Sequence, residues 1–353
     1  MTRSARRRWA AEIDSEIDGL ALTNSGPIFA HVYDPPAGGK WAEDVIPSKL
    51  LAFDRASGER LWAAPCEVGY GRGFGAGLGP DGSLLVVGPT QAGHRAVQVS
   101  AETGEQLGGV DVPEFDEALV DGKSVLIVAL TSLTRLDAAS LEAKWALQAK
   151  DDRFHSSATD GKTLFVAVST KRNRSQGLRA YTVARGGKAG DILSQGQSTI
   201  LGLGAEDGLV TVLVEDLASA LPEDLSRDYQ LAKLMAEDGD DFGGSSLGGG
   251  EGGSAGVVAF AWDAAEKRAE AKWFLDLSSS GLEDDPGEAS IRVDSGKLYV
   301  ARGAMISVYD LLSGRPLGEA AVPGLDDFVA WDVADGALLV AEETRLSVYE
   351  LPD

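Results

Sequence analysis

A carboxylate cluster is the first feature of this 353-residue chain that could bind a ligand. Asp238, Asp240 and Asp241 stand close together with glycine between them, which suits a hard cation such as calcium. The EF-hand pattern fails, because Phe242 stands at its fifth position and Gly249 at its twelfth, where a bidentate Glu is required. The sequence therefore favours a solvated acidic loop over a metal site.

Three histidines, His31, His94 and His155, are the next candidates. Neither their spacing nor that of the single cysteine, Cys66, is typical of metal ligands, so packed or surface histidines are the default interpretation. We expect His155 to start an inner strand and His94 to lie in a loop, so that the two could face a common surface. Both are kept as candidate partner-binding residues, and no metal is predicted.

No catalytic sequence pattern of the G-x-S-x-G or H-E-x-x-H type occurs in the chain. Residues 71–79 are rich in glycine, but they lie between an outer strand and a hairpin turn instead of before a helix, as a phosphate-binding loop would. We interpret them as an inner strand whose glycines allow backbones to approach closely. Neither a catalytic residue nor a cofactor is predicted.

A basic cluster and an isolated tryptophan could contact a partner. Lys171, Arg172 and Arg174 stand together on an acidic chain, where they could pair with a neighbouring acidic segment or receive an acidic peptide. Trp41 lies within residues 35–47, where it could fold its loop down or anchor a ligand. All four residues are candidate partner-binding positions.

The composition excludes some classes of partner. Acidic residues outnumber basic ones by 55 to 32, giving a net charge of −23, so the chain repels nucleic acid and anionic membranes. One cysteine allows no internal disulfide. Arginines near the N-terminus are followed by Trp9 and Glu12 instead of an apolar run, so we expect a cytoplasmic protein, or a periplasmic one if a signal peptide has been removed. The isolated chain is expected to be monomeric.

Two series of turns divide the chain into repeats. The first is a small or acidic residue, then Gly, then an apolar strand, and it ends in Gly26, Gly82, Gly122, Gly161, Gly208, Gly296 and Gly336. The second occupies the position of Asp54 and recurs as Ser100, Asp137, Thr182, Asp263, Asp310 and Glu350. The two series alternate strictly, which predicts four-stranded meanders of about 40 residues and a seven-bladed β-propeller.

The two ends of the chain complement each other. Trp62 follows Asp54 by eight residues and Trp145 follows Asp137 by eight, whereas the chain stops at Asp353, three residues after Glu350. The last blade therefore lacks an outer strand. The N-terminal strand around Trp9 has no partner of its own, so we predict that it completes the last blade and closes the ring.

Residues 53–62 show the repeat most completely: an apolar residue, Asp54, two residues, Ser57, Gly58, three residues and Trp62. This pattern resembles the repeat of the pyrroloquinoline-quinone-type propellers, the group that includes quinoprotein dehydrogenases and the propeller lipoprotein of bacterial outer-membrane assembly. The resemblance implies one all-β propeller domain over residues 1–353. Glycine replaces the tryptophan in three other copies, at Gly108, Gly190 and Gly318.

The blades differ mainly between their second and third strands, where the fifth blade carries an insertion at residues 215–254. Its sequence predicts a helix over residues 220–237, with Pro222 in the first turn, followed by a glycine-rich acidic linker. We expect this helix to present Leu221, Leu225 and Tyr229 to a partner. Insertions concentrated on one face are typical of a binding face, although loops can also drift without function.

The sequence leaves two function classes open. The first is a non-catalytic scaffold that binds another protein or peptide, as an accessory or adaptor subunit of a bacterial multi-protein system. The second is a quinoprotein-type enzyme or other small-ligand-binding propeller. The resemblance implies that such an enzyme holds its cofactor over the central channel with a cysteine pair, basic residues and calcium. One cysteine and no matching ligand pattern favour the scaffold.

Overall fold

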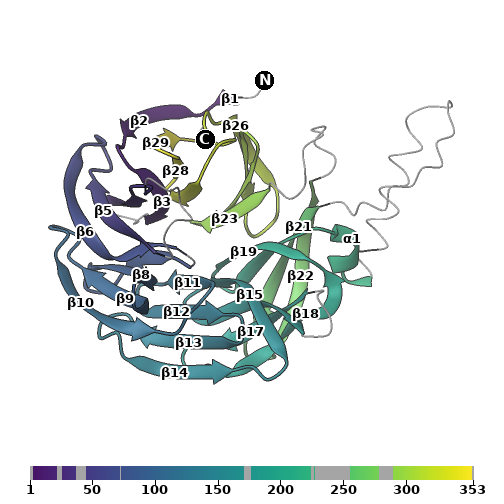
Figure 1. Cartoon of the computed structure of the whole chain (residues 1–353). Helices are drawn as coiled ribbons and strands as arrows, with labels where there is room; N and C mark the ends of the chain where they lie inside the picture. Colours follow the sequence, from purple (N-terminus) through teal and green to yellow (C-terminus); the bar gives the residue numbers. More distant parts are fainter. Residues whose placement is uncertain are drawn as a thin grey trace.

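The computed structural model describes residues 3–21, 26–36, 45–71, 73–170, 176–223, 226, 255–277 and 289–351. Seven sheets follow one another around a ring, which confirms the predicted all-β seven-bladed propeller (Figure 1). Among these residues no helix is long and apolar enough to cross a membrane.

Each blade is an antiparallel meander of four strands, which we call a to d from the centre of the ring outward. Blade 1 comprises β3 (Glu16–Ala21), β4 (Ile28–Tyr33), β5 (Ile46–Phe53) and β6 (Arg60–Tyr70). Blade 2 comprises β7 (Gly75–Leu78), β8 (Leu84–Thr90), β9 (Gly93–Val99) and β10 (Gln106–Val112). Blade 3 comprises β11 (Glu117–Val120), β12 (Ser124–Ala129), β13 (Ser132–Asp137) and β14 (Ala143–Gln148).

The remaining blades follow the same order of strands. Blade 4 comprises β15 (Asp152–Thr159), β16 (Thr163–Thr170), β17 (Gln176–Thr182) and β18 (Lys188–Ser198). Blade 5 comprises β19 (Ile200–Glu206), β20 (Leu209–Val214), β21 (Gly256–Asp263) and β22 (Arg268–Asp276). Blade 6 comprises β23 (Ser290–Asp294), β24 (Lys297–Arg302), β25 (Met305–Asp310) and β26 (Pro316–Ala321), and blade 7 comprises β27 (Ala330–Ala334), β28 (Ala337–Glu342) and β29 (Arg345–Glu350) with β2 (Arg6–Glu12) as its outer strand.

The N-terminal strand closes the ring, as predicted. β2 pairs antiparallel with β29, and Trp9 stands opposite Val348, just as Trp62 stands opposite Ala52 in blade 1. β1 (Arg3–Ser4) continues across to blade 6, where it pairs in parallel with β26. The N-terminus therefore ties the last two blades together and covers both an open edge and a seam.

The hydrophobic core is divided into seven clusters, one between each pair of neighbouring blades. The b and c strands are apolar on both faces for this reason: in β4 every residue from Ile28 to Tyr33 is buried. The inner strands of neighbouring blades also approach one another closely. A Cβ atom added at Gly75 would lie 2.4 Å from the carbonyl oxygen of Ala118 on the next inner strand, which confirms the inner-strand interpretation for the part of residues 71–79 that forms β7.

Tryptophans on four of the outer strands link their blades to the next. Each indole N–H donates to a backbone carbonyl in the c–d turn of the following blade, and each ring lies against the glycine of that turn. The four bonds run from Trp9 to Arg55 (2.9 Å), Trp62 to Ala101 (3.0 Å), Trp145 to Val183 (2.7 Å) and Trp273 to Leu311 (3.0 Å). The tryptophan and the turn glycine of the repeated sequence pattern therefore make a contact between neighbouring blades and not within one blade.

Where glycine replaces this tryptophan on the outer strands of blades 2 and 4, the c–d turn of the following blade lacks its glycine. Leu141 occupies the turn position of blade 3 with φ 56°, and the preceding blade has Gly108 in place of tryptophan. Lys267 occupies it in blade 5 with φ 53°, and the preceding blade has Gly190. Leu141 is itself buried between blades 2 and 3. The residue in the turn and the residue on the outer strand of the preceding blade therefore change together, because the two pack against each other at one site.

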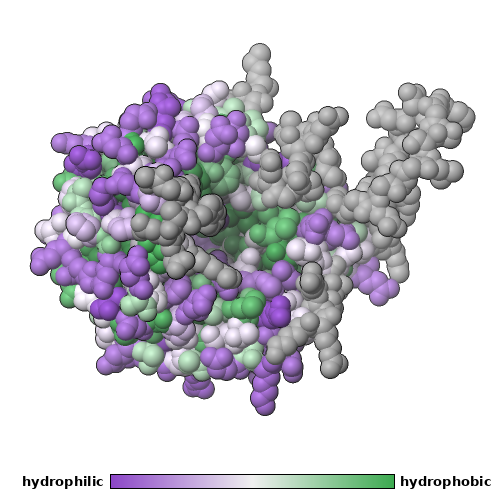
Figure 2. All heavy atoms as spheres, in the orientation of Figure 1, coloured by the Kyte–Doolittle hydropathy of each residue, from purple (hydrophilic) through white to green (hydrophobic). Residues whose placement is uncertain are grey.

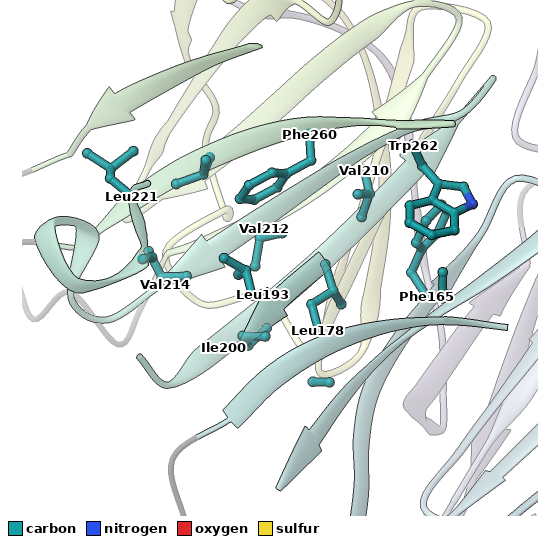
Figure 3. Packing of buried hydrophobic residues seen from close by; sticks show 14 of the residues in the cluster. Phe165, Leu178, Leu193, Ile200, Val210, Val212, Val214, Leu221, Phe260 and Trp262 are labelled. Atoms are coloured by element: carbon teal, nitrogen blue, oxygen red, sulfur yellow. The ribbon is translucent and has the colours of Figure 1, made fainter. Parts of the chain in front are cut away.

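The insertion of blade 5 begins differently from the prediction. The described helix is α1 (Leu217–Ala220), capped by the side chain of Asp216, and it starts three residues before the helix expected at 220–237. A second turn begins as expected at Pro222, whose carbonyl accepts the amide of Ser226 at 2.7 Å. Leu221 is buried beside Val214 in the core between blades 4 and 5, so the structure does not offer it to a partner (Figure 3). The ends of the insertion lie close together, since Val214 pairs with Gly256.

Candidate functional site

One face of the ring carries all the b–c and d–a connections, because successive turns of a meander emerge at opposite ends. We call it the loop face; residues 34–36, 45, 130–131 and 343–344 lie there. Long connections are not confined to the b–c loops, because a long d–a connection also separates β22, which ends at Asp276, from β23, which begins at Ser290. The face of the ring shown in Figure 2 is hollowed near its centre, and hydrophobic residues line part of the hollow.

A pocket of about 460 Å³ opens on the loop face between blades 3 and 4. We call it the blade 3–4 pocket. It combines two carboxyl groups and one imidazole with an exposed leucine. Its lining consists of Asp116, Glu117, Leu130, Phe154, His155 and Ser156.

Two neighbouring turns position this lining. Asp116 precedes β11 and its amide donates to Val128 at 3.0 Å, while the amide of Phe154 donates to Leu130 at 2.9 Å. Leu130 stands at the tight b–c turn of blade 3, and 40% of its surface is exposed. A β-bulge follows Phe154, because β15 carries one residue more than β16 before Ser157. The extra residue brings His155 and Ser156 to the pocket while Phe154 stays buried.

The charges of the pocket come from its carboxyl groups. Glu117 accepts a hydrogen bond from Ser157 at 2.6 Å; burial raises the pKa of its carboxyl group, against the opposing effects of Ser157 and of Arg292. Burial and Arg153 lower the pKa of His155, against a smaller opposing effect of Asp116, so this imidazole is neutral at pH 7. Its Nε2 atom lies 2.7 Å from Ser169 Oγ. The pocket is therefore acidic on one side and apolar on the other.

A second hollow, of about 630 Å³, lies where blade 7 meets blade 1. The connection from β2 to β3 forms its wall, held by the amides of Ile13 and Ile17, which donate to the 343–344 turn at 2.8 Å. One guanidinium, that of Arg345, pairs with Glu12 at 3.0 Å. This blade 7–1 groove is lined by Glu12, Glu16, Ile17, Asp327, Val329, Glu342, Glu343, Thr344 and Arg345.

A buried polar network crosses blade 1 at His31. The imidazole Nδ1 lies 3.0 Å from Asp18 Oδ2, and Nε2 lies 2.6 Å from Ser48 Oγ and 3.1 Å from the carbonyl oxygen of Val68. Ser48 gives its own proton to Val68, so it accepts from His31. Both ring nitrogens therefore face acceptors and both carry a proton. Burial opposes this charge, but Asp18 and Cys66 outweigh it and raise the pKa of His31 to about 9.

This network has the composition of a catalytic Ser–His–Asp triad but not its geometry. The hydroxyl of Ser48 donates to a carbonyl instead of to the imidazole, and a nucleophile needs the reverse arrangement. His31 is 1% exposed and Ser48 6%, so no substrate can reach them. We assign the network a structural role within blade 1.

The structure places two of the predicted partner-binding residues near the blade 3–4 pocket. His155 lines it, on the inner strand β15 as expected. His94 lies in β9 and not in a loop, because blade 2 extends both strands up to a tight turn at which Thr90 pairs with Gly93. Its ring packs edge-on to Phe115 at 5.2 Å, directly before Asp116, so the two histidines share one region. Trp41, Lys171, Arg172, Arg174, Leu225 and Tyr229 lie outside the described residues.

Asp116, Glu117 and Leu130 were not among the residues predicted from the sequence. Only the packing of blade 3 against blade 4 brings these residues close to His155, and no local sequence pattern indicates this contact. A charged residue at the start of an inner strand was the one available signal, since such a residue must face the loop side of the channel.

The residues present do not fit a quinone cofactor that is held by a cysteine pair, basic residues and calcium, as expected for the quinoprotein enzymes. The chain has one cysteine, and Cys66 lies on β6, the outer strand of blade 1. Over the described part of the chain no group of three His, Cys, Asp or Glu side chains could hold a metal ion. The acidic stretch at residues 238–243 lies outside that part.

These observations define the class: a seven-bladed β-propeller with an acidic, partly apolar loop face, whose repeats resemble those of the pyrroloquinoline-quinone-type propellers. Residues 48–200 match the family described as outer membrane protein assembly factor BamB, which confirms the resemblance found in the repeats. No curated protein sequence matches the chain.

Two solved structures share the fold over nearly their whole length. BamB from Moraxella catarrhalis is 13% identical, with 98% of this chain and 97% of that chain covered and a TM-score of 0.50. Hydrazine synthase from Kuenenia stuttgartiensis is 11% identical, with 97% of each chain covered and a TM-score of 0.61. BamB is named as an assembly factor, whereas hydrazine synthase is named as an enzyme. The two structures therefore show which fold this chain has and do not show its function.

Proposed function

We propose that this chain is a non-catalytic propeller scaffold that binds another protein through its loop face, as an accessory or adaptor subunit of a bacterial multi-protein system. The blade 3–4 pocket carries the proposal, because it exposes Leu130 next to the carboxyl groups of Asp116 and Glu117 on a rigid ring. An exposed apolar anchor point with a polar rim is typical of protein interfaces.

The partial likeness to an assembly factor supports a binding role. That family is named for assembling other proteins, and residues 48–200 of this chain match it. The free thiol of Cys66 supports a cytoplasmic location, which cell fractionation tests.

Affinity capture from the native host tests the binding role. The bait proteins are the wild type, Leu130→Ser in the pocket, and Leu107→Ser on the outer strand β10, where the leucine is also exposed. We expect one captured protein to be lost with Leu130→Ser and retained with Leu107→Ser. Identical captured sets for all three would contradict the use of this face.

Titration with the quinone and calcium tests the non-catalytic part. A ligand that binds the folded state raises its melting temperature, so an enzyme would show saturable stabilisation. We expect none. A saturable increase in melting temperature would restore the enzyme as the leading function.

A further inference from the structure

We propose that the blade 3–4 pocket binds a partner segment in which one large apolar side chain is flanked by Lys or Arg. This inference rests on the proposed function and specifies the chemistry of the partner.

The apolar component comes from Leu130 and Phe154. Leu130 stands at a turn and remains 40% exposed, and the buried side chain of Phe154 also lines the pocket. The volume of about 460 Å³ accommodates a side chain of leucine or phenylalanine size with part of its backbone. Covering Leu130 removes apolar surface from water on both partners, which favours binding.

The flanking charges follow from the other wall. Asp116 and Glu117 contribute carboxyl groups, and none of the six lining residues is a lysine or arginine. Arg153 and Arg292 act on the pocket only from outside its lining, as shown by their effects on His155 and Glu117. His155 is neutral at pH 7 and can exchange hydrogen bonds without repelling a cation.

The whole molecule reinforces this preference. With a net charge of −23 it attracts basic segments and repels acidic ones over long distances. The blade 7–1 groove on the same face has five carboxyl groups and one guanidinium, so the loop face is acidic at a second place as well.

Fluorescence polarisation with synthetic peptides tests the proposal on the full chain. The probe is a labelled nine-residue peptide with one central Leu flanked by two Lys on each side. Two comparison peptides replace all Lys by Glu, or the Leu by Gly. We expect saturable binding of the first alone, weakened about tenfold or more between about 50 and 200 mM salt, because paired charges are screened.

Isosteric and matched variants locate the contact. Glu117→Gln keeps the shape and the bond from Ser157 but removes the carboxyl group that a bound Lys or Arg would hold ionised, so affinity for the Lys–Leu peptide should fall about fivefold, as for one charge-assisted hydrogen bond. Leu130→Ser should abolish the difference between the Leu and Gly peptides. Glu105→Gln and Leu107→Ser make the same changes at exposed positions on blade 2, away from the pocket, and should have no effect. Matching melting curves establish that every variant is folded.

Several results would overturn the proposal. Equal binding of the Leu and Gly peptides would reduce it to unspecific charge attraction, and binding of the Glu peptide would reverse its sign. Binding that appears only after Lys171, Arg172 and Arg174 are replaced by alanine would show that the chain's own loop occupies the pocket. A captured host protein that depends on Leu130 but contacts it through an acidic segment would refute this inference and leave the proposed function standing.

Discussion

The indole N–H of Trp9 donates to the carbonyl oxygen of Arg55 at 2.9 Å, and its ring lies so close to Gly58 that an added Cβ would be 2.5 Å from it. One residue belongs to the last blade and the other to the first. The ring is therefore closed by the same tryptophan contact that joins blades elsewhere, with the N-terminal strand taking the place of a continuous chain.

Replacing Trp9 by alanine should lower the free energy of unfolding by about 3–5 kcal/mol, because a buried indole and its hydrogen bond are lost together. Leu312→Ala serves as the control, since this large side chain is 71% exposed and should cost little. Urea denaturation measures both. Removal of residues 1–13 should have a larger effect, with aggregation through the exposed edge of β29. Equal stability losses for the two single variants would show that Trp9 does not close the ring.

Gly186 and Gly161 separate the tryptophan contact from backbone strain. Both have positive φ, at 68° and 81°, but a Cβ at Gly186 would lie 2.6 Å from the Trp145 ring whereas one at Gly161 meets nothing within 4 Å. Gly161→Ala should cost about 1 kcal/mol for the left-handed conformation alone. Gly186→Ala should cost clearly more by thermal or urea denaturation. Equal costs would mean that the ring moves away freely.

The repeats made the fold predictable from sequence, because turns with fixed chemistry recur at a fixed spacing. The closing strand was also predictable, since Glu350 and Trp9 each lack a partner along the chain. Trp273 comes two residues late in sequence but makes the same contact with Leu311, after a register shift in blade 5. The same one-residue shift occurs beside Trp62, so the late position of Trp273 reflects a c–d hairpin whose two strands are both longer, which sequence spacing alone could not show.

His31 should make stability depend on pH. Its pKa in the folded protein is about 9, above the ordinary 6.5, so the folded state binds the proton more tightly. The resulting stabilisation is complete below pH 6.5 and is lost as the pH rises through 9, by about 3 kcal/mol in total. Urea denaturation between pH 6 and 9.5 measures this loss.

The matched variant for this prediction is His155→Gln. Burial lowers the pKa of His155, so its titration falls below pH 6.5 and its loss should leave the decline above that pH intact. His31→Gln should lower stability at pH 6 and flatten the profile. A wild-type profile as flat as that of His31→Gln would show that His31 is not charged in the folded protein.

The insertion of blade 5 should be removable only in part. Replacing residues 227–254 by a short Gly–Ser link should change the free energy of unfolding by less than about 1 kcal/mol, because closure entropy depends weakly on loop length. Replacing residues 215–254 should cost several kcal/mol, since it removes the buried side chains of Leu217 and Leu221. Denaturation of the two shortened proteins side by side measures the difference. Equal stability would show that α1 does not contribute to the core.

The site was less predictable than the fold. His155 was selected correctly as a residue of the inner strand, but the residues that make a pocket with it come from blade 3. Leu221 fitted an amphipathic helix, yet it caps the end of α1 and packs inward. Periodicity shows which residues share a face, whereas it does not show which face the rest of the fold leaves uncovered.

The most direct test of the central claim is site-specific photo-crosslinking in the native host. A photoreactive amino acid replaces Leu130 in one strain and Leu107 in another, two exposed leucines on different parts of the ring. We expect a discrete protein adduct from position 130 that position 107 does not give. The same adducts from both positions, or none from position 130, would contradict a protein-binding role for the loop face.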